Sequence, residues 1–129
     1  MSGFKEINLK QLSLEPFSLI GDAWMLITSG DMQDYNMMTA SWGGLGVLWN
    51  KLVAICFIRP QRYTFEFVER NDYFSLSFYN EKYRDALTLC GTKSGRDVNK
   101  TVATNFTPAF NEPAPYFEEA DLVFVCKKI

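Results

Sequence analysis

The longest uninterrupted apolar run in this chain, LVAICFI at Leu52–Ile58, has only seven residues. A helix that crosses a membrane needs about 20 apolar residues in succession, so no membrane span or membrane partner is expected. A short apolar run rich in β-branched residues is typical of a strand that is buried on both faces. We therefore predict a doubly buried strand at Leu52–Ile58.

Other short segments also have the pattern of strands. The segment Tyr73–Phe78, YFSLSF, alternates with a period of two, which predicts a half-buried strand. Three more strands are predicted at Ala23–Ser29, at Asn36–Ser41, where the glycines that follow are expected to break the strand, and at Ala120–Lys128.

Helices are predicted between these strands. Pro60 suits the first turn of one helix, with Tyr63 and Phe67 at helical spacing after it. Asn80 is a good N-cap for a second helix, which Gly91 is expected to end.

A third, short helix is predicted after the second. Ser94 and Asp97 have the spacing of a capping box, and Val98 and Val102 would share one face. With 129 residues and no repeat or change of composition, the chain is predicted to form one domain, 1–129. We expect a mainly β fold with peripheral helices, a barrel or strongly bent sheet, and not a doubly wound parallel sheet.

Composition excludes several classes of function. The net charge is −2 (13 Lys and Arg against 15 Asp and Glu), so no nucleic-acid partner is expected. The absence of histidine excludes Ser-His-Asp and Cys-His catalysis and most zinc sites, so we expect no catalytic side chain of these kinds and no metal. If the chain is an enzyme, a bound cofactor is expected to supply the chemistry.

The N-terminus indicates a cytoplasmic protein, and the cysteines are expected to be reduced thiols. The segment MSGFKEINLK lacks the apolar region of a signal peptide. Cys56, Cys90 and Cys126 are an odd number at wide spacing, without a CxxC motif. Each lies in an apolar segment, which favours buried, reduced thiols over reactive ones.

Arg59 and Arg62 form the first candidate site. They flank Pro60 where a predicted strand leads into a predicted helix. Arginine forks onto phosphate oxygens through two hydrogen bonds, and Thr64 adds a hydroxyl, so these residues can bind an anion. The alternative is that both arginines pair with nearby carboxylates such as Glu66 or Glu69.

The second candidate is the stretch Thr39, Ala40, Ser41 and Trp42, which precedes Gly43, Gly44 and Gly46. Small side chains allow a ligand close to the backbone, and hydroxyl groups can bind the polar edge of a ring. The alternative is a glycine-rich hairpin turn. The dinucleotide fingerprint and the P-loop motif are both absent.

The third candidate is TKSGRD, Thr92–Asp97. Its polar side chains surround a glycine at a predicted helix start, where phosphate can bind. A capped helix with solvated charges is the alternative.

Four stretches, in this order, resemble the flavin reductase-like family, specifically its flavoredoxin-type members. They are NMMTASWGGLGVLWNK, AICFIRPQRYTFEFV, YFSLSFY and LCGTKSGRDVNK, and the similarity extends from about Ile7 to Lys128. The resemblance implies an FMN-binding split β-barrel with a Greek-key core. It also implies a homodimer that holds FMN near the subunit interface.

The resemblance further implies the contacts of FMN. Thr39, Ala40, Ser41 and Trp42 would contact the ring and ribityl chain; Arg59, Gln61, Arg62, Tyr63 and Thr64 would surround the phosphate; Lys93, Ser94, Gly95 and Arg96 are further candidates.

The activity that the resemblance implies is flavin reduction by NADH or NADPH, with hydride transfer to the flavin N5. The alternative is an electron carrier that binds flavin and is reduced by a partner protein. No nucleotide fingerprint distinguishes NADH from NADPH.

Members of this family usually continue for a few dozen residues beyond the segment that corresponds to VCKKI, and these residues add a final strand. This chain ends at Ile129, so we expect the C-terminal strand to be missing and a sheet edge to be exposed.

Overall fold

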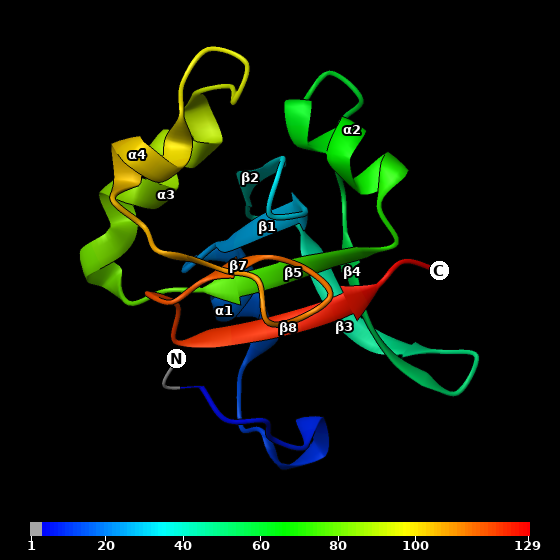
Figure 1. Ribbon diagram of the computed structural model, residues 1–129. Helices are drawn as coiled ribbons and strands as arrows, with labels where there is room; N and C mark the ends of the chain where they lie inside the picture. Colours follow the sequence, from blue (N-terminus) through cyan, green and yellow to red (C-terminus); the bar gives the residue numbers. More distant parts are fainter. Residues whose placement is uncertain (1–3) are drawn as a thin grey trace.

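A four-stranded antiparallel sheet, in the order β2-β1-β5-β8, lies at the centre of the computed structural model, which describes residues 4–129 (Figure 1). Its strands are β1 (Met25–Gly30), β2 (Tyr35–Ala40), β5 (Tyr73–Phe78) and β8 (Leu122–Lys127). All four were predicted from the sequence, with ends that differ by no more than two residues. The sheet is antiparallel throughout, as expected for a mainly β fold.

Both faces of this sheet are covered. On one face Met25, Ile27 and Leu76 join an apolar cluster, and on the other Leu26 packs with Phe117 in a second cluster. The alternation of side chains across each strand places neighbouring residues in different clusters. The sheet therefore forms the middle layer of the core.

The prediction that β5 is half-buried is wrong. Ser75 and Ser77, whose polar side chains suggested a solvated face, are fully buried. The Ser75 hydroxyl donates to the Pro115 carbonyl at 2.6 Å, and the Ser77 hydroxyl lies 2.9 Å from that of Tyr79. Because these partners satisfy the hydroxyl groups, serine can lie in the core at little cost.

Two further predictions are wrong, those for the glycines after β2 and for the burial of Leu52–Ile58, because these residues belong to a separate hairpin. Strands β3 (Gly43–Leu48) and β4 (Lys51–Cys56) pair only with each other, so the glycines lie within a strand. Trp49 and Asn50 connect them with φ of 52° and 61°, the left-handed conformation of a two-residue hairpin turn. The hairpin extends away from the central sheet (Figure 1), and β4 is partly exposed on both faces, contrary to the doubly buried strand that its apolar sequence predicted.

Helices α2 (Tyr63–Arg70) and α3 (Arg84–Thr92) lie over β1 and β2 (Figure 1). The helix α2 begins at Tyr63, so Pro60 precedes it and Arg62 is its N-cap. Asn80 caps a short 3₁₀ turn, η2 (Glu81–Tyr83), which leads into α3. Gly91 lies inside α3, one residue before its end.

The predicted start of the third helix at Ser94 is wrong. These residues form a turn, and α4 (Lys100–Thr104) begins later, where the Asn99 side chain accepts from the amide of Val102. Val102 is 74% exposed, so it does not form a buried face with Val98. The remaining elements are short: η1 (Leu9–Gln11), α1 (Pro16–Gly21), β6 (Pro108–Ala109) and β7 (Tyr116–Phe117). No helix within residues 4–129 has the length and apolar character to cross a membrane.

Candidate functional site

The three candidate segments meet where β2 ends, α2 begins and α3 ends. The Arg59 guanidinium lies 5.3 Å from the ring centre of Trp42, which joins the second segment to the first. Arg62 donates to the carbonyl of Gly91 in α3 at 3.3 Å. Gly95 lies against Asn36 and Tyr63, which joins the third segment to the first and to β2. Tertiary contacts therefore bring together residues more than 50 positions apart in the chain.

Neither Arg59 nor Arg62 forms an ion pair. The ion pairs within residues 4–129 are Arg70 with Asp34 and Arg96 with Glu66. The alternative in which Glu66 or Glu69 neutralises Arg59 and Arg62 is therefore wrong. Two guanidinium groups without carboxylate partners can attract an anion at this place.

The prediction that Pro60, which the two arginines flank, lies in the first turn of a helix is also wrong. The Arg62 amide donates to the Arg59 carbonyl at 3.0 Å, so the two residues are linked by a turn that precedes α2. Arg62 caps α2 without a side-chain hydrogen bond to the first helical turn. Its guanidinium is therefore directed elsewhere, to Gly91.

Thr64 lies beneath the surface. It is 1% exposed, and its Oγ1 accepts a hydrogen bond of 2.9 Å from Nδ2 of Asn36. This bond connects the first turn of α2 to β2. The structure brings Thr64 close to the other site segments but does not expose its hydroxyl beside the arginines.

The segment Thr39–Trp42 passes from the core to the surface. Thr39 donates from Oγ1 to the carbonyl of Leu87 at 2.5 Å, and Ala40 is buried. Ser41 is exposed, and Trp42 is 58% exposed beneath the Arg59 guanidinium. This end of β2 therefore presents a hydroxyl and an aromatic ring beside a cation, which suits a ligand with a flat ring and a negative charge.

The turn after α3 has its own internal contacts. Ser94 Oγ accepts from the amide of Arg96 at 3.1 Å. The Arg96 guanidinium lies 4.5 Å from the ring centre of Tyr63 and pairs with Glu66. Lys93, the C-cap of α3, is exposed, as is Gln61 in the turn before α2. Arg96 is therefore less free to bind an anion than Arg59 or Arg62.

Sequence reasoning missed one charged residue of this region, Lys100. It is 4% exposed, and its Nζ donates to the carbonyls of Met37 at 2.7 Å and Cys90 at 3.0 Å. Burial lowers the pKa of Lys100 to about 8. No local pattern distinguishes it from a solvated lysine at a helix start, because only tertiary packing buries it.

The cysteines are free thiols, and burial raises the pKa of each to about 11. A thiol with this pKa is almost fully protonated near neutral pH, which makes it a poor nucleophile. Residues 4–129 contain no group of three or more Cys, Asp or Glu side chains placed to hold a metal ion.

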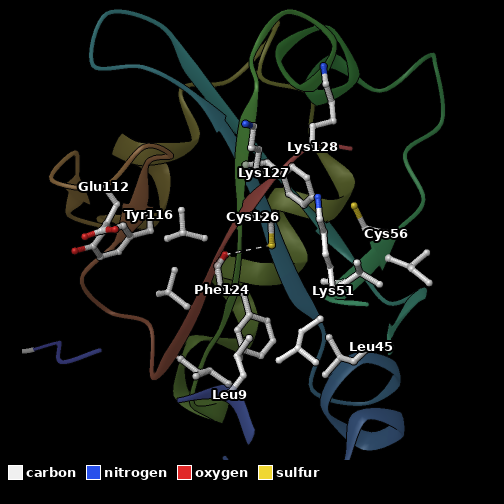
Figure 2. A pocket seen from close by; sticks show the side chains of 18 of the residues that line it. Leu9, Leu45, Lys51, Cys56, Glu112, Tyr116, Phe124, Cys126, Lys127 and Lys128 are labelled. Carbon is white, nitrogen blue, oxygen red and sulfur yellow. Dashed lines mark hydrogen bonds between the residues drawn. The ribbon is translucent and has the colours of Figure 1, made fainter. Parts of the chain in front are cut away.

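A large groove lies elsewhere. It has a volume of about 1430 Å³, and mainly apolar residues of β4, β5, β8 and the segment 4–14 line it. Figure 2 shows Cys56 of β4 and Cys126 of β8 among the side chains that line it. None of the thirteen sequence-predicted site residues lies in this groove. The candidate site, at the end of β2, is therefore separate from this groove.

A sequence profile shows the family of this chain. Residues 17–129 match the profile of the "Flavin reductase like domain". None of the curated proteins compared with the chain matches it.

Several solved structures share the fold. A flavoredoxin from Methanosarcina acetivorans has 24% identity and a TM-score of 0.72 over 81% of this chain and 56% of its own. Flavoredoxin of Desulfovibrio vulgaris (Miyazaki F) has 21% identity and a TM-score of 0.72 over 98% of this chain and 67% of its own. An FMN-binding domain of a flavin reductases-like enzyme from Shewanella baltica has 16% identity and a TM-score of 0.72 over 87% of this chain and 60% of its own. The chain thus spans about 60% of the length of such relatives, and the expected mainly β, split-barrel fold is confirmed.

The close approach of Gly95 to β2 gives a prediction. A Cβ at position 95 would lie 2.1 Å from Oδ1 of Asn36 and 3.0 Å from the Tyr63 ring. In Gly95→Ala, Asn36 must move and its bond to Thr64 is lost, which we expect to cost about 1–3 kcal/mol of the free energy of unfolding in urea titrations.

Gly44→Ala is the control, because a Cβ there meets nothing within 4 Å. In an Asn36→Ala background, Gly95→Ala should cost markedly less, since the clash with Oδ1 is gone. Equal costs in both backgrounds would contradict the proposed clash.

Proposed function

Since the chain belongs to the flavin reductase-like family, we propose that it binds FMN over the end of β2 and catalyses flavin reduction by NADH or NADPH. The observation that carries this proposal is the pair Arg59 and Arg62. Both lack carboxylate partners within residues 4–129, and Arg59 lies against the exposed ring of Trp42. Solved structures of FMN-binding proteins share the fold, which supports the choice of ligand.

The residues present fit FMN. The arginines would hold the phosphate, and Thr39, Ala40, Ser41 and Trp42 would lie along the ribityl chain and ring. A single terminal phosphate matches two neighbouring cations, so we propose that FMN binds more tightly than FAD. Lys93, Ser94 and Gly95 lie in the adjoining turn, where they would border the phosphate.

When bound, FMN supplies the hydride acceptor at its N5 atom, so the reaction needs no acid or base from the protein. This agrees with a chain that has no histidine and whose thiols stay protonated. The role of the protein is to bind the phosphate, to hold the ring in place and to exclude water on the ring side. Three free thiols also suit a reducing cytoplasm, which we propose as the location.

We predict that NADH or NADPH rapidly reduces the FMN bound to the protein. Stopped-flow absorbance at the flavin band should show rapid bleaching with NADH or NADPH. Slow bleaching by both, at the rate of free FMN, would contradict the reductase and favour an electron carrier that is reduced by a partner protein. A colourless protein that does not quench added FMN fluorescence would contradict flavin binding itself.

We also predict that Arg59→Ala and Arg62→Ala weaken FMN binding by roughly 10- to 150-fold each. Hydrogen bonds to a charged group contribute roughly 1.5–3 kcal/mol, and about 1.4 kcal/mol is a factor of ten. Fluorescence titration with FMN and with riboflavin measures the effect, with folding checked by circular dichroism.

Riboflavin lacks the phosphate, so its affinity should hardly change in either variant. Arg70→Ala, at the other end of α2, is the matched control and should leave both affinities unchanged. Lysine at position 59 or 62 should restore only part of the affinity, because it lacks the planar fork. Equal losses for FMN and riboflavin would refute the phosphate assignment.

We further propose that the protein forms a homodimer through the hairpin β3–β4. The hairpin patch consists of exposed apolar residues that lie on or directly beside these strands: Val47, Leu48, Trp49, Leu52, Ile55 and Phe57. A two-stranded ribbon is only marginally stable without further packing, and an identical ribbon would supply that packing. Trp49 is 73% and Phe57 60% exposed, so these two alone offer on the order of 250 Å² towards the roughly 800 Å² that each partner of a stable dimer buries.

We expect Val47→Asp to convert the dimer to a monomer in light scattering at micromolar concentration. The aspartate would place a charge without a partner in the buried interface. Val102→Asp is the control, because Val102 is similarly exposed (74%, against 69% for Val47) but lies on α4 outside the patch. A wild-type protein that is monomeric at 100-fold higher concentration would refute the homodimer, and binding of an unrelated protein at this patch would assign the patch to another partner.

A further inference from the structure

The large groove between β4 and β8 opens the apolar interior of the fold to the surface. Within residues 4–129, β4 pairs only with β3 and β8 pairs only with β5, so no backbone ladder joins β4 to β8. Ala54 and Cys56 of β4 line one side of the groove, and Phe124 and Cys126 of β8 line the other. All four pack against the same core cluster, yet they are only half-buried.

The size and shape of the groove suit an apolar chain. Its volume of about 1430 Å³ exceeds the roughly 300–1,000 Å³ of pockets that hold small ligands. The two strands that flank it have six residues each, which makes them about 20 Å long. Apolar surface in contact with water is unfavourable, and a barrel interior that side chains do not fill commonly holds a ligand. An extended alkyl chain would remove this surface from water.

Positive charge gathers at one end of the groove. Figure 2 shows the amino groups of Lys51, Lys127 and Lys128 on one side of Cys126, and the ring of Phe124 on the other side. Lys51 begins β4 and Lys127 ends β8, so each strand brings a lysine to this end. Figure 1 agrees, because the hairpin turn before β4 and the C-terminal end of β8 lie on the same side of the molecule.

No carboxylate of the described residues neutralises these lysines. The ion pairs within residues 4–129 involve arginine only. The Nζ of Lys128 donates to the carbonyls of Val68 at 2.7 Å and Glu69 at 2.9 Å, which leaves its charge in place. Acidic side chains also line the groove, and Figure 2 shows one of them, Glu112, beside Tyr116 and apart from the lysines. The lysine end of the groove is therefore complementary to an anion.

We propose that this groove binds a fatty acid, with the alkyl chain between β4 and β8 and the carboxylate at Lys51, Lys127 and Lys128. The apolar walls select the chain, and the three cations at one end select an anionic head over a neutral or cationic one, since ammonium and carboxylate groups form charge-assisted hydrogen bonds. The inference is independent of the proposed FMN site, because no residue of that site lines the groove.

Calorimetric titration with octanoate, decanoate and dodecanoate, each below its micelle concentration, tests the proposal. Each added pair of CH₂ groups should tighten binding roughly 10-fold, because burial of one CH₂ group contributes a factor of roughly 3 to 4. Dodecyltrimethylammonium has the same chain with a cationic head and should bind roughly 10-fold more weakly than dodecanoate. Equal affinities for these two ligands, or no dependence on chain length, would overturn the proposal.

A double variant tests the lysines. Lys51→Gln combined with Lys127→Gln should lower the affinity for dodecanoate roughly 5-fold and leave the affinity for dodecanol unchanged. Both positions are exposed, so the fold should tolerate the changes. Lys82→Gln, which changes an exposed lysine outside the groove, is the control and should keep the wild-type affinity. An unchanged affinity for dodecanoate in the double variant, or equal losses for both ligands, would overturn the assignment of the carboxylate.

Thiol labelling of the wild-type protein locates the ligand. Cys56 and Cys126 line the groove, whereas Cys90 is fully buried elsewhere. Burial raises the pKa of each thiol to about 11, so the reaction with N-ethylmaleimide is followed at pH 9, where more thiolate is present. Saturating dodecanoate should slow labelling of Cys56 and Cys126 by roughly 5-fold or more in mass spectrometry and leave Cys90 unchanged. Unchanged rates at Cys56 and Cys126 would overturn the proposed location.

Two other occupants are outcomes of further measurements. Val47 does not line the groove, so Val47→Asp, the variant expected to be monomeric, should bind dodecanoate like the wild type. Loss of binding in this variant would assign the groove to the homodimer and overturn the proposal. Vesicles of phosphatidylcholine and phosphatidylserine should not sediment the protein. Sedimentation with these vesicles, without binding of dodecanoate, would assign the groove to a lipid surface and overturn it as well.

Discussion

Burial of the central sheet on both faces is the constraint on which the rest of the structure depends. Strands β1 and β5 lie in the middle of the sheet, and the residues of β1 from Met25 to Ser29 are fully buried. Each face needs its own cover, and α2 and α3 provide that cover over β1 and β2. The start of α2 and the end of α3 consequently meet above the end of β2, which is where the candidate site lies.

The sequence was sufficient for the features that depend on local pattern. Apolar runs between turn residues located β1, β2, β5 and β8, and helical spacing located α2 and α3. The sequence was insufficient where contacts with distant residues determine whether a side chain is buried. Ser75 and Ser77 have the polar character of a solvated face, but Pro115 and Tyr79 satisfy them inside the core. The apolar sequence of β4 indicated burial, whereas the strand belongs to a hairpin that leaves the sheet.

The candidate site, like the fold, could be predicted only in part from the sequence. Motifs identified the three segments, yet the contacts between them could not be read from the sequence. Glu66 was considered as a partner of Arg59 or Arg62 and instead pairs with Arg96, which is 30 residues away in the chain. Thr64 bonds Asn36, and the buried Lys100 bonds two elements from distant parts of the sequence, β2 and α3. Residue types predict the chemistry of a site, but packing decides which of those residues remain available.

The contacts between α2 and the turn at 94–97 have a consequence for motion. This junction includes an exposed ion pair and a cation stacked on Tyr63, and beside it Arg62 makes a long hydrogen bond to α3. The bonds of Lys100 that join α4 to β2 and α3 are buried in contrast. Exposed ion pairs contribute little and weaken with salt. Opening of this junction therefore needs far less free energy than global unfolding, so its amides should exchange with solvent through local fluctuations while the sheet stays protected. A ligand can therefore reach the end of β2 through local opening of this junction, while the central sheet stays folded.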